Sequence, residues 1–224
     1  LSKTFNKGTI NEKIALDHIN LTLNEGDFVT VIGGNGAGKS TMLNAVAGVW
    51  PVDEGAIIVD GNNITGLPDF KRATLIGRVF QDPMLGSAPD MQIIENLALA
   101  ARRGKRRTLK WGVTKKEKED YKEQLKILDL GLEDRLTQKV GLLSGGQRQA
   151  LTLLMASIQK PKLLLLDEHT AALDPKTAET IMELTNKVVR EKNLTTIMVT
   201  HNLRFAVEYG DRLLMMHQGH AVID

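Results

Sequence analysis

The sequence contains the glycine-rich stretch Gly33-Gly34-Asn35-Gly36-Ala37-Gly38-Lys39-Ser40-Thr41. The apolar, β-branched run 28–32 precedes it and predicts a buried strand, while apolar positions at helical spacing follow it over residues 41–49. The glycines allow positive φ angles and leave no Cβ atoms between a ligand and the backbone N–H groups. The stretch therefore predicts a strand, a turn that can hold an anion, and a helix whose positive N-terminal end faces that anion.

A glycine-rich turn that ends in Lys-Ser between a strand and a helix is typical of the phosphate-binding P-loop. In such a loop Lys39 would contact the β- and γ-phosphates of a nucleotide, and the Ser40 hydroxyl would bind Mg²⁺. A plain glycine-rich turn is the alternative, and the strand and helix on either side disfavour it. The residues that we expect to bind the nucleotide here are Gly33, Asn35, Gly36, Ala37, Gly38, Lys39, Ser40 and Thr41.

The composition of the 224 residues narrows the class of protein. Since 29 Lys and Arg nearly balance 27 Asp and Glu, the net charge of +2 gives no argument for a nucleic-acid partner. There is no Cys for disulfides or thiolate metal sites, and no apolar run long enough to be a membrane helix. We expect a cytoplasmic protein. Leu1 is not an initiator Met and residues 221–224 stop within a strand-like pattern, so we also expect trimmed or disordered tails.

Strand and helix patterns alternate along most of the chain, which predicts an α/β fold with a mainly parallel sheet flanked by helices. Strands are expected at 14–23, 28–32, 55–60, 75–80, 163–166, 195–199 and 212–216, and helices at 41–49, 93–101, 115–128, 145–158 and 176–191. Strand patterns vanish between residues 83 and 159. The sequence therefore predicts a nucleotide-binding core formed by 1–82 and 160–224, and a helical subdomain formed by 83–159.

Two carboxylates follow the four leucines at 163–166, which are typical of a strand buried on both faces. At the carboxyl end of such a strand, Asp167 would hold Mg²⁺, commonly through a water molecule, and Glu168 would orient and deprotonate the attacking water. An ordinary exit from the strand into a loop is the alternative. The presence of a P-loop at the expected separation disfavours it.

The segment Leu143-Ser144-Gly145-Gly146-Gln147 precedes a predicted helix. Ser144 would cap that helix, and the two glycines would leave its first N–H groups uncovered, which creates a second site for an anion. A chain with two such helix starts either binds two anions or shares them with a neighbour.

These motifs resemble those of the nucleotide-binding subunits of ATP-binding cassette (ABC) transporters, over the whole chain, and residues 143–147 match the family's signature motif without change. Residues 33–40 match its Walker A motif, and 163–168 its Walker B motif with the catalytic glutamate. The resemblance implies a P-loop NTPase fold, with a RecA-like core that includes an N-terminal antiparallel β part, and an ABC-specific helical subdomain.

The resemblance also implies roles for single residues. Gln81 would contact Mg²⁺ or the attacking water and link to a membrane partner, and His201 would contact the γ-phosphate. Asp174, at the end of a D-loop-like segment, would lie with Ser144 at the seam of a dimer. Phe5 lies near the position of the aromatic that stacks on adenine. Stacking on the base and plain packing in the core are equally good interpretations of Phe5. The catalytic set is then Glu168, His201, Gln81 and Lys39, the metal ligands are Ser40, Gln81 and Asp167, and Ser144, Gly145, Gly146 and Gln147 join the nucleotide-binding set.

One departure from the family is His169, where proline is usual. Because proline only stiffens that turn, we expect catalysis to survive the change. The basic run 102–107 is expected to be a solvated face, with contact to anionic lipid headgroups or an acidic partner as the alternative.

The function implied is that of an ATPase, with ATP and Mg²⁺ as cofactors, in which two copies close head-to-tail around two Mg-ATP and drive a separate transmembrane permease. We expect a position at the inner face of the cell membrane, import of an amino acid or a similar small solute, and an extracytoplasmic solute-binding protein. Export or lipid extraction is the first alternative. A soluble ABC ATPase acting on DNA or ribosomes is the second, and the chain has neither a long coiled coil nor a second cassette. A small kinase or GTPase is the third, and it would not need residues 143–147.

Overall fold

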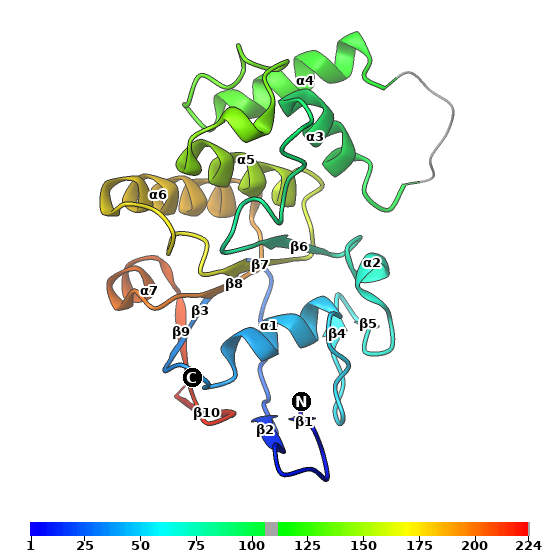
Figure 1. The fold of residues 1–224 in the computed structure, drawn as a ribbon, viewed down its shortest axis with the longest axis vertical. Helices are drawn as coiled ribbons and strands as arrows, with labels where there is room; N and C mark the ends of the chain where they lie inside the picture. The colour runs from blue at the N-terminus through cyan, green and yellow to red at the C-terminus, as the bar shows by residue number, and fades with distance from the viewer. Residues whose placement is uncertain (106–111, 224) are drawn as a thin grey trace.

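The computed structural model describes residues 1–105 and 112–223, and its centre is a six-stranded sheet (Figure 1). The strand order is β10-β9-β3-β8-β7-β6. All neighbouring pairs are parallel except β10 with β9. The bounds are β3 Phe28–Gly33, β6 Ile76–Val79, β7 Leu163–Asp167, β8 Thr196–Val199, β9 Arg212–His217 and β10 His220–Ile223. The predicted mainly parallel sheet is confirmed.

Two small antiparallel sheets complete the β structure. One pairs β1 (Lys3–Phe5) with β2 (Lys13–Leu16), and the other pairs β4 (Ile58–Val59) with β5 (Asn62–Asn63). The expected N-terminal antiparallel part is therefore present. It lies near α1 (Lys39–Ala47) in the lower half of Figure 1.

Helices cover both faces of the sheet, and the leucines of β7 show how. Leu163 and Leu165 join a hydrophobic cluster with Met42 and Leu43 of α1. Leu164 and Leu166 belong to a second cluster, which includes residues of the helices on the opposite face. Successive strand residues point to opposite faces, so a run of leucines is what a strand covered on both sides requires.

The second cluster is built by helices that gather above the sheet in Figure 1. They are α3 (Ile93–Ala101), α4 (Lys115–Lys126), α5 (Gly145–Ser157) and α6 (Pro175–Lys192), with the short 3₁₀ turn η1 (Val140–Leu142) before α5. Within the described part of 83–159 there is an isolated β-bridge but no strand, as expected. The division at residues 83 and 159 into a core and a helical subdomain stays a prediction.

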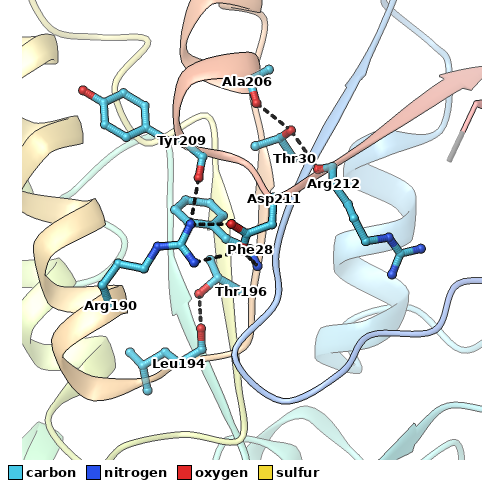
Figure 2. A network of polar contacts seen from close by, with 9 residues as sticks. All are labelled: Phe28, Thr30, Arg190, Leu194, Thr196, Ala206, Tyr209, Asp211 and Arg212. Atoms are coloured by element: carbon cyan, nitrogen blue, oxygen red, sulfur yellow. Dashed lines mark hydrogen bonds and ion pairs between the residues drawn. The ribbon is translucent and has the colours of Figure 1, made fainter.

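A network of polar contacts lies at the N-terminal end of β3, the end opposite the glycine-rich loop (Figure 2). Asp211 receives hydrogen bonds from the Phe28 backbone N–H and from both terminal nitrogens of Arg190, at 2.7–2.9 Å. The Thr30 hydroxyl donates to the Ala206 carbonyl at 3.0 Å. These contacts tie α6 and α7 (Leu203–Tyr209) to β3 and hold the strand that leads into the glycine-rich loop.

Some elements differ from the expectation. The predicted strand 14–23 is wrong beyond Leu16, because His18 has a φ of 51° and the backbone leaves the extended conformation there. Residues 55–60 form only the two-residue strand β4, bounded by positive φ at Gly55 and Asp60. The helix α7 was not predicted; the Asn202 side chain caps it by accepting from the Phe205 N–H at 3.2 Å. The four-residue α2 (Asp69–Arg72) was likewise not predicted.

Candidate functional site

The loop after β3 turns so tightly that two of its glycines have no room for a side chain. A Cβ on Gly33 would lie 2.3 Å from the Met216 carbonyl oxygen, and one on Gly38 would lie 2.5 Å from that of Ala15. Gly38, with a φ of 103°, directly precedes α1, and no side chain caps that helix. The first N–H groups of α1 are thus left for a ligand, as expected for an anion-binding loop.

Lys39 lies across this loop with 5% of its surface exposed. Its ammonium donates hydrogen bonds to the carbonyl oxygens of Gly33 at 2.8 Å and Gly34 at 3.1 Å. A buried ammonium needs such partners, and phosphate oxygens could replace them because they are stronger acceptors.

A cavity of about 190 Å³ opens over the loop. Residues 35–41 form its floor, and Phe5, Lys13, Ala15, Glu168 and His201 complete its wall. The carboxyl ends of β3, β7 and β8 bring these groups to one edge of the sheet, which is where parallel sheets bind ligands. The structure therefore brings together eight of the predicted nucleotide-binding residues, Phe5 and residues 35–41, and three of the four predicted catalytic ones, Lys39, Glu168 and His201.

The two carboxylates at the end of β7 each have a nitrogen-containing side chain as partner. Oε1 of Glu168 lies 2.7 Å from Nε2 of His201, and Oδ2 of Asp167 lies 3.0 Å from Nη2 of Arg78. Glu168 has a φ of 47° and its N–H donates to the Val199 carbonyl of β8 at 3.0 Å. The chain thus turns sharply at Glu168, and this turn lets the two adjacent carboxylates meet different partners.

His169 is buried, with 2% of its surface exposed. Its Nε2 lies 3.0 Å from the Thr185 hydroxyl, which itself donates to the Ile181 carbonyl at 2.7 Å. Since that hydroxyl proton is already used, Nε2 must carry the proton, and burial lowers the pKa of His169 to about 4. At the position where the family usually has proline, this chain therefore has a neutral imidazole that is hydrogen-bonded to Thr185 of α6.

Ser144 caps α5, as predicted. Its hydroxyl accepts from the Gln147 N–H, and Oε1 of Gln147 accepts from the Ser144 N–H, both at 3.2 Å. Asp174 caps α6 in the same way through the Thr177 N–H at 3.1 Å. Ser144 and Asp174 are exposed, and none of the cavity-lining residues comes from 143–147 or 171–174. In one chain the signature segment and the cavity are thus separate.

Three further predictions concern Phe5, Gln81 and the basic run 102–107. Phe5 lines it and meets the Trp50 ring edge-on, with 5.0 Å between the ring centroids. Gln81 is exposed just beyond β6 and, like Asp167, is not among the lining residues. Of the basic run, Arg102 pairs with Glu117 at 2.9 Å, and burial lowers the pKa of Arg103. Arg106 and Arg107 lie outside the described residues.

Sequence reasoning missed two residues. Lys13 lines the cavity from β2, and nothing in its local sequence pattern marks it. Arg78 contacts Asp167 from the neighbouring strand β6. A single charged residue inside the apolar segment 75–80, predicted to be a strand, was a signal that could have found it.

Residues 1–105 and 112–223 contain neither a cluster of metal-binding side chains nor a membrane-spanning helix. No group of three or more His, Cys, Asp or Glu side chains is placed to hold a metal ion there. Every helix in these ranges is too short or too polar to cross a bilayer.

Comparisons with known proteins agree on a single family. A family model described as ABC transporter matches residues 16–171. The tyrosine transport ATP-binding protein of Clostridioides difficile (strain R20291) is 48% identical over all of this chain and 89% of its own length. The phosphonates import ATP-binding protein PhnC 2 of Oceanobacillus iheyensis is 35% identical over 93% of this chain and 83% of its own.

Solved structures give the same result. The dimeric post-hydrolysis structure of the ATP-binding cassette MJ0796, bound to ADP and Pi, has a TM-score of 0.82 and 32% identity, covering 99% of this chain and 94% of its own. Among the sequence relatives, the spermidine/putrescine import ATP-binding protein PotA of Haemophilus influenzae is 36% identical over 98% of this chain, and the chain spans 54% of its length. The chain therefore belongs to the ABC transporter family, as an ATP-binding and ATP-hydrolysing subunit.

Proposed function

We propose that two copies of this chain close head-to-tail around two Mg-ATP, hydrolyse them, and thereby drive a separate membrane-spanning permease. One observation carries the proposal: Lys39, Glu168 and His201 line one cavity, while the exposed cap at Ser144 lies outside it. Each chain then holds half of a site, and a second copy supplies the other half.

The nucleotide phosphates would occupy the floor of the cavity. Lys39 would exchange the carbonyl oxygens of Gly33 and Gly34 for phosphate oxygens, and the uncapped N–H groups of α1 would bind the same anion. The base would stack on Phe5, which lines the wall and meets the Trp50 ring edge-on. Lys13 adds a positive charge at the same wall.

Ser40, Asp167 and Gln81 would hold Mg²⁺ together with the phosphates. Mg²⁺ bound to a nucleotide commonly has only one or two protein ligands, so the lack of a carboxylate cluster in the described residues fits this metal. When bound, the ion supplies positive charge that offsets the charge developing on the phosphate oxygens.

Glu168 would act as the general base that takes a proton from the attacking water. His201, whose Nε2 lies 2.7 Å from Oε1 of Glu168, would orient that carboxylate and contact the γ-phosphate from the same wall. Gln81 would approach from the loop after β6 when the site closes.

Closure would bring Ser144, Gly145, Gly146 and Gln147 of the second copy over the phosphates, with Asp174 at the seam. The cap at Ser144 uses the N–H of Gln147, so the N–H groups of Gly145 and Gly146 would be the ones offered to such a partner. The dimeric cassette bound to ADP and Pi, with its TM-score of 0.82, supports this assembly.

The transport direction is inferred from relatives. Those named for tyrosine transport, spermidine/putrescine import and phosphonate import span 93–100% of this chain. We therefore propose import of an amino acid or a similar small solute, with an extracytoplasmic binding protein delivering it to the permease. The chain would sit at the cytoplasmic face of the membrane, held there by the permease.

The replacement Glu168→Gln tests the hydrolytic part of this proposal. The amide keeps the shape of the side chain but cannot accept the proton, so ATP binding is retained and turnover falls by roughly a hundredfold or more. Gel filtration should then detect an ATP-bound dimer. Turnover that stays near the wild-type value would remove Glu168 from the mechanism.

A further inference from the structure

We infer that Arg78 is a positioning residue that holds Asp167 and competes with Mg²⁺ for that carboxylate. The inference rests on the proposed function, because it takes Asp167 as a ligand of the metal. It makes divalent-cation binding depend on a side chain of β6, the strand next to the one that carries Asp167.

The two residues are brought together by the pairing of neighbouring parallel strands. Arg78 of β6 stands opposite Leu165 of β7, and its Nη2 reaches Oδ2 of Asp167 at 3.0 Å. The side chains of Arg78 and Asp167 are 14% and 17% exposed, so water screens the contact only weakly. The pair is therefore stronger than an ion pair on an open surface.

The guanidinium is held in place by more than this ion pair. Its Cζ lies 4.6 Å from the centroid of the Phe80 ring, a distance at which a cation is attracted to the ring face. Its Nε is buried and has no hydrogen-bond partner among the described residues. The Phe80 ring and the Asp167 carboxylate, which Nη2 contacts, therefore position the guanidinium.

A divalent cation bound at Asp167 would meet the positive charge of Arg78 on the same carboxylate. The two cations repel each other, and the carboxylate oxygen that donates electron density to Arg78 is less available to the metal. Arg78 also lines a second cavity, of about 340 Å³, in which Asp69 is the one carboxylate among the described lining residues. The guanidinium therefore has space, and a second acidic residue in the same cavity, when it leaves Asp167.

Manganese binding to the chain with a non-hydrolysable ATP analogue measures this competition without relying on turnover. Mn²⁺ is followed by electron paramagnetic resonance for the wild type, Arg78→Met, Arg78→Gln and Arg78→Lys. We expect Arg78→Met and Arg78→Gln to tighten Mn²⁺ binding by about tenfold, since a unit charge near the metal is removed. Arg78→Lys keeps the charge and should bind Mn²⁺ within about twofold of the wild type.

Asp167→Asn separates this inference from the proposed function. If Asp167 ligates the metal, Asp167→Asn weakens Mn²⁺ binding, and Arg78→Met tightens it less in that background than in the wild type, because the competition for the carboxylate is gone. An Asp167→Asn chain with unchanged Mn²⁺ affinity would refute the metal assignment itself. With that assignment intact, unchanged or weaker Mn²⁺ binding in both folded variants, Arg78→Met and Arg78→Gln, would overturn the role of Arg78.

Discussion

Nε2 of His201 lies 2.7 Å from Oε1 of Glu168, although the two residues follow different strands. Glu168 comes directly after β7 and His201 lies two positions after the end of β8, and these strands are parallel neighbours. The sheet thus holds the proposed base and its orienting partner together before a nucleotide binds.

His201→Ala should lower kcat for ATP hydrolysis by about 10²-fold while leaving the affinity for ATP within a few-fold, because it removes the group that orients the base and meets the γ-phosphate. Steady-state kinetics with separate measurement of ATP binding would check this. His220→Ala is the matched control, since His220 is an exposed histidine that does not line the cavity. Equal kcat values for the two variants would contradict the assignment of His201.

Gly146→Ala should destabilise the packing of α5 on α6. The added Cβ would lie 2.5 Å from Cγ2 of Thr177, whereas a Cβ on Gly145 would lie 3.4 Å from its nearest neighbour in Leu173. We expect Gly146→Ala to cost about 1–2 kcal/mol in the free energy of unfolding and Gly145→Ala to cost less, as urea titration would measure. Thr177→Ser removes Cγ2, so it should restore most of the loss in the Gly146→Ala chain.

Glu117→Gln should lower the melting temperature at pH 7. Hydrogen bonds from the Thr114 N–H, the Arg102 guanidinium and the Thr114 hydroxyl hold the pKa of Glu117 at about 2, below its ordinary 4.5. A carboxyl group whose pKa is lower in the folded than in the unfolded chain stabilises the fold. This contribution to the free energy of unfolding is complete above pH 4.5 and is lost as the pH falls toward 2. The difference in melting temperature between the wild type and Glu117→Gln should therefore become smaller below pH 4.5.

Glu123→Gln is the control for that comparison. Glu123 pairs only with the exposed Lys126 among its described contacts, and its side chain is 70% exposed. Its replacement should change the melting temperature little at any pH. If the melting temperature of Glu117→Gln stays below that of the wild type by the same amount from pH 7 down to the acid transition, the lowered pKa of Glu117 is not the cause.

The sequence predicted elements well where one local pattern dominated. The helices at residues 93–101 and 145–158 have bounds within one residue of α3 and α5, because their apolar faces and caps are encoded locally. The prediction of a strand at 14–23 is wrong beyond Leu16. The alternation of Ile19, Leu21 and Leu23 does not reveal that the backbone turns at His18. That turn depends on contacts with distant parts of the chain, since the N–H groups of Asp17 and Ile19 donate to the carbonyl oxygens of Gly219 and Leu1.

The candidate site shows the same division. The glycine loop and the residues after the leucine strand could be located from spacing alone, because their chemistry needs those types in that order. The contact between Arg78 and Asp167 could not, since it depends on β6 lying beside β7 in one particular register. Lys13 reaches the cavity through the pairing of β1 with β2, which the local sequence does not specify.

The central claim, that two chains share each site, is tested most directly by mixing two inactive variants. Lys39→Ala disables the loop of its own chain, and Ser144→Arg disables the cap offered to the partner, so each homodimer should lack ATPase activity. A mixed dimer that closes head-to-tail contains one intact site, and equal mixing should restore about a quarter of the wild-type rate. ATPase activity that stays absent on mixing, although both variants fold and co-purify as a mixed dimer, would contradict the shared site.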